Sequence, residues 1–157
     1  MLTRFLIAAL FGAGLYAVPA PSRAGDAPAA VQEAARVRAA PVQAVYHFDA
    51  GLEQAKRGLR NIRNHLVADP NAQIAVVGLA DGIDFMLKGA KTDGGYPFEL
   101  LVEELQAEGV KFKICNNTLI ARHVEPDQVL GDVEIVTSGV AELARLQARE
   151  GYAYIKP

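Results

Sequence analysis

Residues 109–119 read GVKFKICNNTL, and this stretch predicts a β-strand that ends at a cysteine and passes directly into a helix. Its apolar side chains alternate with the others at the period of two that is typical of a strand. Cys115, the single cysteine of the chain, therefore leaves the same face of the strand as Lys111 and Lys113. The stretch thus predicts a thiol at the carboxyl end of a strand.

The residues after Cys115 predict the start of a helix. Asn116, Asn117 and Thr118 have side chains of the kind that cap helix N-termini. The unpaired N–H groups of a helix start favour negative charge, and the thiolate is the reactive form of cysteine. A helix start, assisted by Lys113, could therefore lower the pKa of this thiol. The alternative is a small buried residue that closes the strand, because free cysteine is often fully buried.

Residues 1–24 have the pattern of a secretory signal peptide. Arg4 gives a positive amino end, and residues 5–18 form an apolar run that is short for a transmembrane helix. Ser22-Arg23-Ala24 places small residues before a cleavage point at Gly25. We expect cleavage and a periplasmic mature protein; an uncleaved anchor is the alternative. A lone cysteine in an exported chain is buried, paired between chains, or a working thiol.

The mature chain reads as an arm followed by one domain. Residues 25–41 are rich in alanine and proline, which is typical of a linker or N-terminal arm. From residue 42 to residue 157, strand patterns alternate with helix patterns. Strands are expected at 42–48, 74–79, 110–115, 133–136 and 152–155. This alternation predicts a three-layer α/β/α domain with a mainly parallel five-stranded sheet.

The carboxyl ends of these strands define where a ligand would bind, because ligands of open α/β sheets collect there. Besides the cysteine stretch, three strand ends place polar residues or glycines at this edge, namely His47 with Asp49, Asp81-Gly82 and Ser138-Gly139, and the last two pairs enter the candidate site. An Asp-Gly pair is more typical of an ordinary turn than of a site, and Ser138 is more typical of a helix cap than of a nucleophile. We include all four among the candidate supporting residues.

Charge and composition argue against several function classes. Removal of residues 1–24 takes away two of the 16 basic residues and none of the 18 acidic ones, so the net charge falls from −2 to −4. We therefore expect no nucleic-acid binding and no membrane binding after cleavage. The three histidines show no paired spacing, and the chain has neither a dinucleotide nor a Walker motif, so we expect no metal and no organic cofactor. Residues 89–96, with three glycines, are expected to form a loop.

Two segments together resemble the DsrE/DsrF-like family, in particular its exported members. They are the GVKFKICNNTL stretch and the chain end GYAYIKP at residues 151–157, joined by SGVAEL at 138–143. The resemblance implies a flavodoxin-like domain that assembles as trimers or hexamers. It also implies that Cys115 matches the cysteine that carries persulfide sulfur between proteins in the relay members. The chain departs from those members in its expected export and in Asn116-Asn117-Thr118, where they have small apolar residues.

Two functions follow as hypotheses. In the first, the protein handles sulfur outside the cytoplasm, and Cys115 is a thiolate that accepts and passes on sulfane sulfur with a donor and an acceptor protein as partners. In the second, the domain is a non-enzymatic oligomeric binding or assembly module, and Cys115 only packs. Lys111 and Lys113 favour the second hypothesis, because cations on a sheet strand suggest an exposed face or a subunit contact.

Overall fold

Five strands form one sheet in which every neighbouring pair is parallel. The computed structural model describes residues 28–32 and 40–157, so the expected signal peptide and most of the expected arm lie outside the described residues. The strands are β1 (Gln43–Phe48), β2 (Gln73–Gly78), β3 (Lys111–Cys115), β4 (Glu134–Val136) and β5 (Ala153–Ile155). Their order across the sheet is β4-β3-β2-β1-β5. The predicted parallel five-stranded sheet is confirmed.

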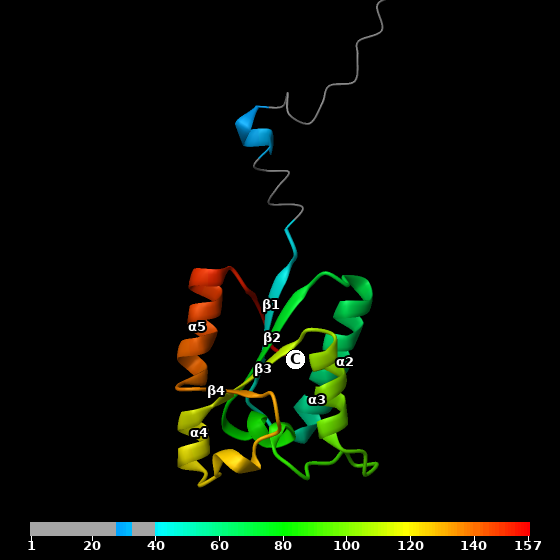
Figure 1. The fold of residues 1–157 in the computed structure, drawn as a ribbon, viewed down its shortest axis with the longest axis vertical. Helices are drawn as coiled ribbons and strands as arrows, with labels where there is room; N and C mark the ends of the chain where they lie inside the picture. The colour runs from blue at the N-terminus through cyan, green and yellow to red at the C-terminus, as the bar shows by residue number, and fades with distance from the viewer. Residues whose placement is uncertain (1–27, 33–39) are drawn as a thin grey trace, which may run out of the picture. The chain divides into compact units, whose positions relative to one another are not determined.

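Helices cover both faces of this sheet, as Figure 1 shows. On one side lie α2 (Leu52–Ala68) and α3 (Phe98–Ala107), and on the other lies α5 (Gly139–Glu150), while α4 (Asn116–Ala121) follows the carboxyl end of β3 and buries Leu119 in the same cluster as α2 and α3. The chain steps across the sheet from β1 to β4 and then returns to the opposite edge at β5. Because crossovers between parallel strands are right-handed, this reversal of direction places α5 on the face opposite α2 and α3. Among the described residues, no helix has the length and apolarity needed to cross a bilayer.

The apolar core is divided unequally by the sheet. The larger cluster lies beneath α2 and α3 and includes four fully buried phenylalanines. Phe85 stands at its centre, with ring centroids 5.1 Å from Phe48, 6.1 Å from Phe98 and 6.3 Å from Phe112. The smaller cluster lies beneath α5 and consists of Val45, Ala75, Val77, Leu143, Leu146 and Tyr152. One helix thus covers the second face where two helices and a 3₁₀ segment cover the first.

The segment after β2 forms a 3₁₀ helix, η2 (Ala80–Met86), that begins close to the end of the strand. Gly82 packs η2 onto the end of β1, because a Cβ at this position would lie 2.2 Å from the carbonyl carbon of Phe48. Glycine is therefore required at this position for η2 to pack against β1. A second short 3₁₀ helix, η3 (Pro126–Gln128), follows α4.

Candidate functional site

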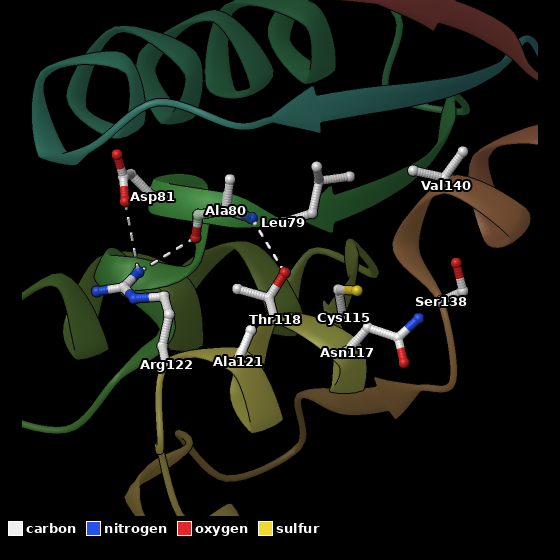
Figure 2. A pocket seen from close by; sticks show the side chains of 10 residues that line it. All are labelled: Leu79, Ala80, Asp81, Cys115, Asn117, Thr118, Ala121, Arg122, Ser138 and Val140. Atoms are coloured by element: carbon white, nitrogen blue, oxygen red, sulfur yellow. Dashed lines mark hydrogen bonds and ion pairs between the residues drawn. The ribbon is translucent and has the colours of Figure 1, made fainter.

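Cys115 ends β3 and lines a pocket of about 500 Å³ at the carboxyl edge of the sheet. The residue is only 5% exposed. The pocket is formed by the ends of β2 and β3, by α4, and by the start of α5 (Figure 2). Its lining residues are Leu79, Ala80, Asp81, Cys115, Asn117, Thr118, Ala121, Arg122, Ser138 and Val140. The thiol is therefore nearly covered, and the little surface it has faces a cavity.

The surroundings of the sulfur favour its anionic form. Burial by itself raises the pKa of the Cys115 thiol. The opposing contributions are hydrogen bonds to the thiolate from the backbone N–H of Gly139, from the hydroxyl and the N–H of Thr118, and from the N–H of Asn117. Together these donors outweigh burial, so the pKa of the thiol lies below its ordinary value. Two helices supply the donors, since Gly139 begins α5 and the others lie in the first turn of α4.

Thr118 is held in place by a contact with the end of β2. Its Oγ1 accepts a hydrogen bond from the backbone N–H of Ala80 at 3.1 Å, which Figure 2 shows. Because this oxygen is occupied as an acceptor, its own proton is available for the sulfur of Cys115. Arg122, one turn further along the chain, donates to the carbonyl oxygen of Ala80 at 3.1 Å. Ala80 is thus fixed from both sides, and its positive φ of 49° shows that the backbone turns sharply at this point.

The start of α5 lies directly against Cys115. A Cβ added to Gly139 would lie 3.1 Å from the Cβ of Cys115 and 3.1 Å from a methyl carbon of Leu79. Glycine at this position therefore allows the N–H group to approach the sulfur closely. Ser138 is the N-cap of α5, because its Oγ accepts a hydrogen bond from the N–H of Ala141 at 3.4 Å. The prediction that Ser138 caps a helix is confirmed, although the residue also lines the pocket.

The role expected for Lys113 is wrong. Its side chain is 7% exposed and does not line the pocket. The ammonium forms ion pairs with Glu134 of β4 at 2.6 Å and Glu142 of α5 at 3.0 Å. Two carboxylates already neutralise this cation, so it is not free to stabilise a thiolate. The suggestion that Lys113 marks an exposed face is also wrong, whereas Lys111 is exposed as expected.

This ion cluster joins α5 to β3. Glu142 bonds to Arg145 at 2.7 Å as well as to Lys113, and Arg145 also pairs with Glu150. Hydrogen bonds from Arg145 are the largest influence on the pKa of Glu142, which falls to about 2 despite an opposing effect of burial. Burial alone would lower the pKa of Lys113, but its two carboxylate partners raise it overall. The cluster thus connects the strand that carries the cysteine to the helix that donates to it.

The structure separates the expected site residues into two groups. Asp81, Asn117, Thr118 and Ser138 line the pocket with Cys115, and Gly139 reaches the sulfur through its N–H group. Asn116 and Gly82 do not line the pocket, and neither does the loop at residues 89–96. The helix begins earlier than the capping residues suggested, at Asn116. Cys115 itself is the N-cap, and Asn116, Asn117 and Thr118 already lie in α4.

Four pocket residues with aliphatic side chains, and one with a guanidinium group, were not expected from the sequence. They are Leu79, Ala80, Ala121, Val140 and Arg122. Arg122 lies four residues after Thr118 and so projects from the same side of α4, which is a spacing the sequence contains. Its guanidinium pairs with Asp84 at 2.7 Å and approaches Asp81 to 3.9 Å. In residues 28–32 and 40–157, no group of three or more histidine, cysteine, aspartate or glutamate residues is placed to hold a metal ion.

The fold and site define a three-layer α/β protein with a recessed, acidified thiol at the carboxyl edge of a parallel sheet. A model of the DsrE/DsrF-like family matches residues 18–157, and the chain belongs to this family. It is similar to MTH1491, a protein of unknown function from Methanobacterium thermoautotrophicum, with which it shares 32% sequence identity. The alignment covers 74% of this chain and 99% of MTH1491, and the TM-score is 0.67. It also shares the fold of the ychN protein from E. coli, with 22% identity, 75% and 100% of the two chains covered, and a TM-score of 0.63. A search of curated proteins found no match.

Proposed function

We propose that this protein is a sulfur carrier, in which the Cys115 thiolate accepts sulfane sulfur from a donor and passes it to an acceptor. The observation that supports the proposal is the set of four hydrogen-bond donors around a thiol that opens onto a pocket. A structural cysteine has no need of donors that lower its pKa, whereas a nucleophilic one depends on them. Membership of the DsrE/DsrF-like family agrees with a role of the sulfur-relay type.

The proposed transfer follows the chemistry of thiol–disulfide exchange. The Cys115 thiolate attacks the outer sulfur of a donor persulfide, R–S–S–H, and a new S–S bond forms at Cys115. The S–S bond of the donor breaks, R–S⁻ leaves with the electron pair, and the proton stays on the transferred sulfur. An acceptor thiolate then attacks that outer sulfur and regenerates the Cys115 thiolate. Neither step requires an external oxidant or reductant, because one S–S bond replaces another.

The experiment is to incubate the folded protein with inorganic polysulfide and to measure its intact mass. We expect an adduct of one sulfur atom on the wild type and none on Cys115→Ser. The adduct should disappear when a small thiol is added as acceptor, with release of sulfide or a new persulfide. A folded wild-type protein that gains no sulfur from inorganic polysulfide or from any alkyl or glutathione persulfide would refute the proposal.

A non-enzymatic binding or assembly module remains the second candidate, and the 5% exposure of Cys115 favours it. A buried thiol that only packs should react with iodoacetamide after denaturation and not before. A carrier thiol should react in the native protein, and its rate should follow a thiol pKa below the ordinary value. Comparing native and denatured alkylation rates therefore separates the two functions.

We further propose that the protein works in the periplasm as a homo-oligomer, a trimer or hexamer. The basis for export is the pattern of residues 1–24, and its test is the mass of the protein recovered from the periplasm, which should begin at Gly25. Assembly is supported by exposed apolar side chains outside the pocket lining, namely Ile135 on β4 and Ile120 on α4. Light scattering of the purified mature protein measures the subunit number directly.

A further inference from the structure

The walls of the pocket beside Cys115 are largely aliphatic. Leu79 follows β2, Ala80 begins η2, Ala121 comes from α4 and Val140 from the first turn of α5. In Figure 2 the sulfur of Cys115 points to the side on which Val140 lies, whereas Ala80 and Ala121 lie on the side of Thr118. The volume of about 500 Å³ is within the range of about 300–1,000 Å³ that small-molecule sites occupy. The pocket therefore has the size and the surface for a small organic group with an apolar body.

The charged groups at the pocket do not favour an anion. Arg122 is the only cation in the lining, and it is held by Asp84 at 2.7 Å with Asp81 at 3.9 Å. One guanidinium and two carboxylates leave a net negative charge, to which the Cys115 thiolate adds another. An anionic donor would meet like charge where it must approach most closely, which disfavours its binding. The pocket thus selects for an uncharged donor.

The position of the sulfur determines how a donor reaches it. Cys115 is 5% exposed, whereas Val140 beside it is 66% exposed, so the sulfur lies inward of the apolar rim. A donor must carry its own outer sulfur past that rim before the two sulfur atoms meet. A slender aliphatic chain can do so while it buries its methylene groups against Leu79, Ala121 and Val140, at about 0.8 kcal/mol for each buried CH₂.

We propose that the sulfur donor to Cys115 is a persulfide with an uncharged aliphatic group R, which binds in the pocket in its protonated form R–S–S–H. This inference rests on the proposed carrier function and names its substrate class. The thiolate of Cys115 attacks the outer sulfur of R–S–S–H, the donor S–S bond breaks, and the aliphatic thiolate R–S⁻ leaves while the proton remains on the transferred sulfur. The aliphatic group R occupies the pocket throughout, and it leaves as a thiol after it takes up a proton from water.

The experiment compares two donors that share the same reacting S–S–H group, n-butyl persulfide and glutathione persulfide, each released from a precursor in solution. The rate of sulfur addition to Cys115 is followed by intact mass and divided by the rate of the same donor with a small free thiol. We expect the normalised rate to be about tenfold or more higher for the butyl donor, as befits a pocket that discriminates by apolar contact. The butyl donor should also show saturation, which the free thiol cannot show.

Two variants test the two arguments separately. Val140→Glu introduces a charge at the rim and should remove the preference for the butyl donor, whereas Val67→Glu, at a 79% exposed position on α2, should leave it intact. Asp81→Asn removes one of the carboxylates and should raise the rate with glutathione persulfide relative to the butyl donor. The rates are compared at a pH above the thiol pKa of each variant, so that differences in the fraction of Cys115 present as thiolate do not affect the comparison.

The outcomes distinguish this inference from the function on which it rests. One outcome is that the normalised rate of sulfur uptake from inorganic polysulfide or glutathione persulfide equals or exceeds that from the butyl donor. This result would refute the proposal of an aliphatic donor, while the proposed carrier function would still stand. An unchanged preference in Val140→Glu would refute the aliphatic donor as well. No adduct from any of the three donors would overturn the carrier function itself.

Discussion

Thr118 offers the sharpest test of how the structure acidifies Cys115. Valine has nearly the same shape as threonine and lacks the hydroxyl, so Thr118→Val removes one donor to the thiolate and leaves the backbone donors in place. A hydrogen bond to a charged group contributes about 1.5–3 kcal/mol, and one pKa unit corresponds to about 1.4 kcal/mol. We therefore expect the pKa of the Cys115 thiol to rise by about one to two units.

The same substitution has a second, separable effect on stability. The N–H of Ala80 loses its acceptor, Thr118 Oγ1, which lies 3.1 Å away in the structure. An unpaired N–H group costs about 1–3 kcal/mol when it stays buried and less when water can reach it. Urea denaturation of Thr118→Val should therefore show a loss of no more than that amount. Thr118→Ser is the matched control, because it keeps the hydroxyl and should preserve both the thiol pKa and the bond to Ala80.

The assay is the rate of iodoacetamide alkylation of Cys115 as a function of pH. The pKa is taken from the midpoint of the profile, since the rate at one pH combines thiolate population with intrinsic nucleophilicity, and nucleophilicity falls as the pKa falls. Circular dichroism must first show that the variant is folded. A midpoint for Thr118→Val that coincides with those of the wild type and Thr118→Ser would refute the assignment of the hydroxyl as a donor to the thiolate.

Two further substitutions test the contact between α5 and β3. Gly139→Ala places a Cβ 3.1 Å from the Cβ of Cys115, so we expect α5 to shift outward. The pKa of the Cys115 thiol should then rise, and the free energy of unfolding should fall by about 1–3 kcal/mol. An alkylation profile and a urea denaturation curve that both match those of the wild type would contradict this expectation. Glu142→Gln removes a carboxylate whose pKa is about 2 in the folded protein, below its ordinary 4.5. Because the folded state holds this proton less tightly than the unfolded state, Glu142 stabilises the fold above about pH 4.5, and that contribution, on the order of 3 kcal/mol, is lost as pH falls toward 2. Urea denaturation between pH 6 and pH 3 should show a shallower loss of stability for Glu142→Gln than for the wild type; equal slopes would show that the pairing of Glu142 with Arg145 and Lys113 carries no linkage.

The sequence was sufficient to predict the sheet and the position of the thiol. Alternation along residues 110–115 identified β3, and the helix-forming pattern after Cys115 placed the cysteine at a strand–helix junction. Both features depend on neighbours in the chain. Ser138 was recognised for the same reason, since a helix cap is a local motif.

The electrostatics of the site could not be predicted in the same way. Lys113 was expected near the thiolate because only its own strand was considered, and its partners Glu134 and Glu142 come from the next strand and the last helix. Whether these two carboxylates come close to Lys113 depends on the order of the strands in the sheet. It also depends on which face of the sheet α5 covers. The donation from Gly139 depends on the same long-range packing, and so does the aliphatic wall formed by Leu79 and Val140.

The acidified sulfur is assembled from segments that are far apart in the chain. Ala80 orients Thr118, and Gly139 donates from a helix that follows Cys115 by more than twenty residues. In an unfolded or newly synthesised polypeptide these groups are dispersed, so its cysteine has the acidity of a free amino acid side chain. The pH dependence of chemical labelling can therefore follow folding of the molecule, because the thiol of Cys115 reaches its lowered pKa only when the final helix docks.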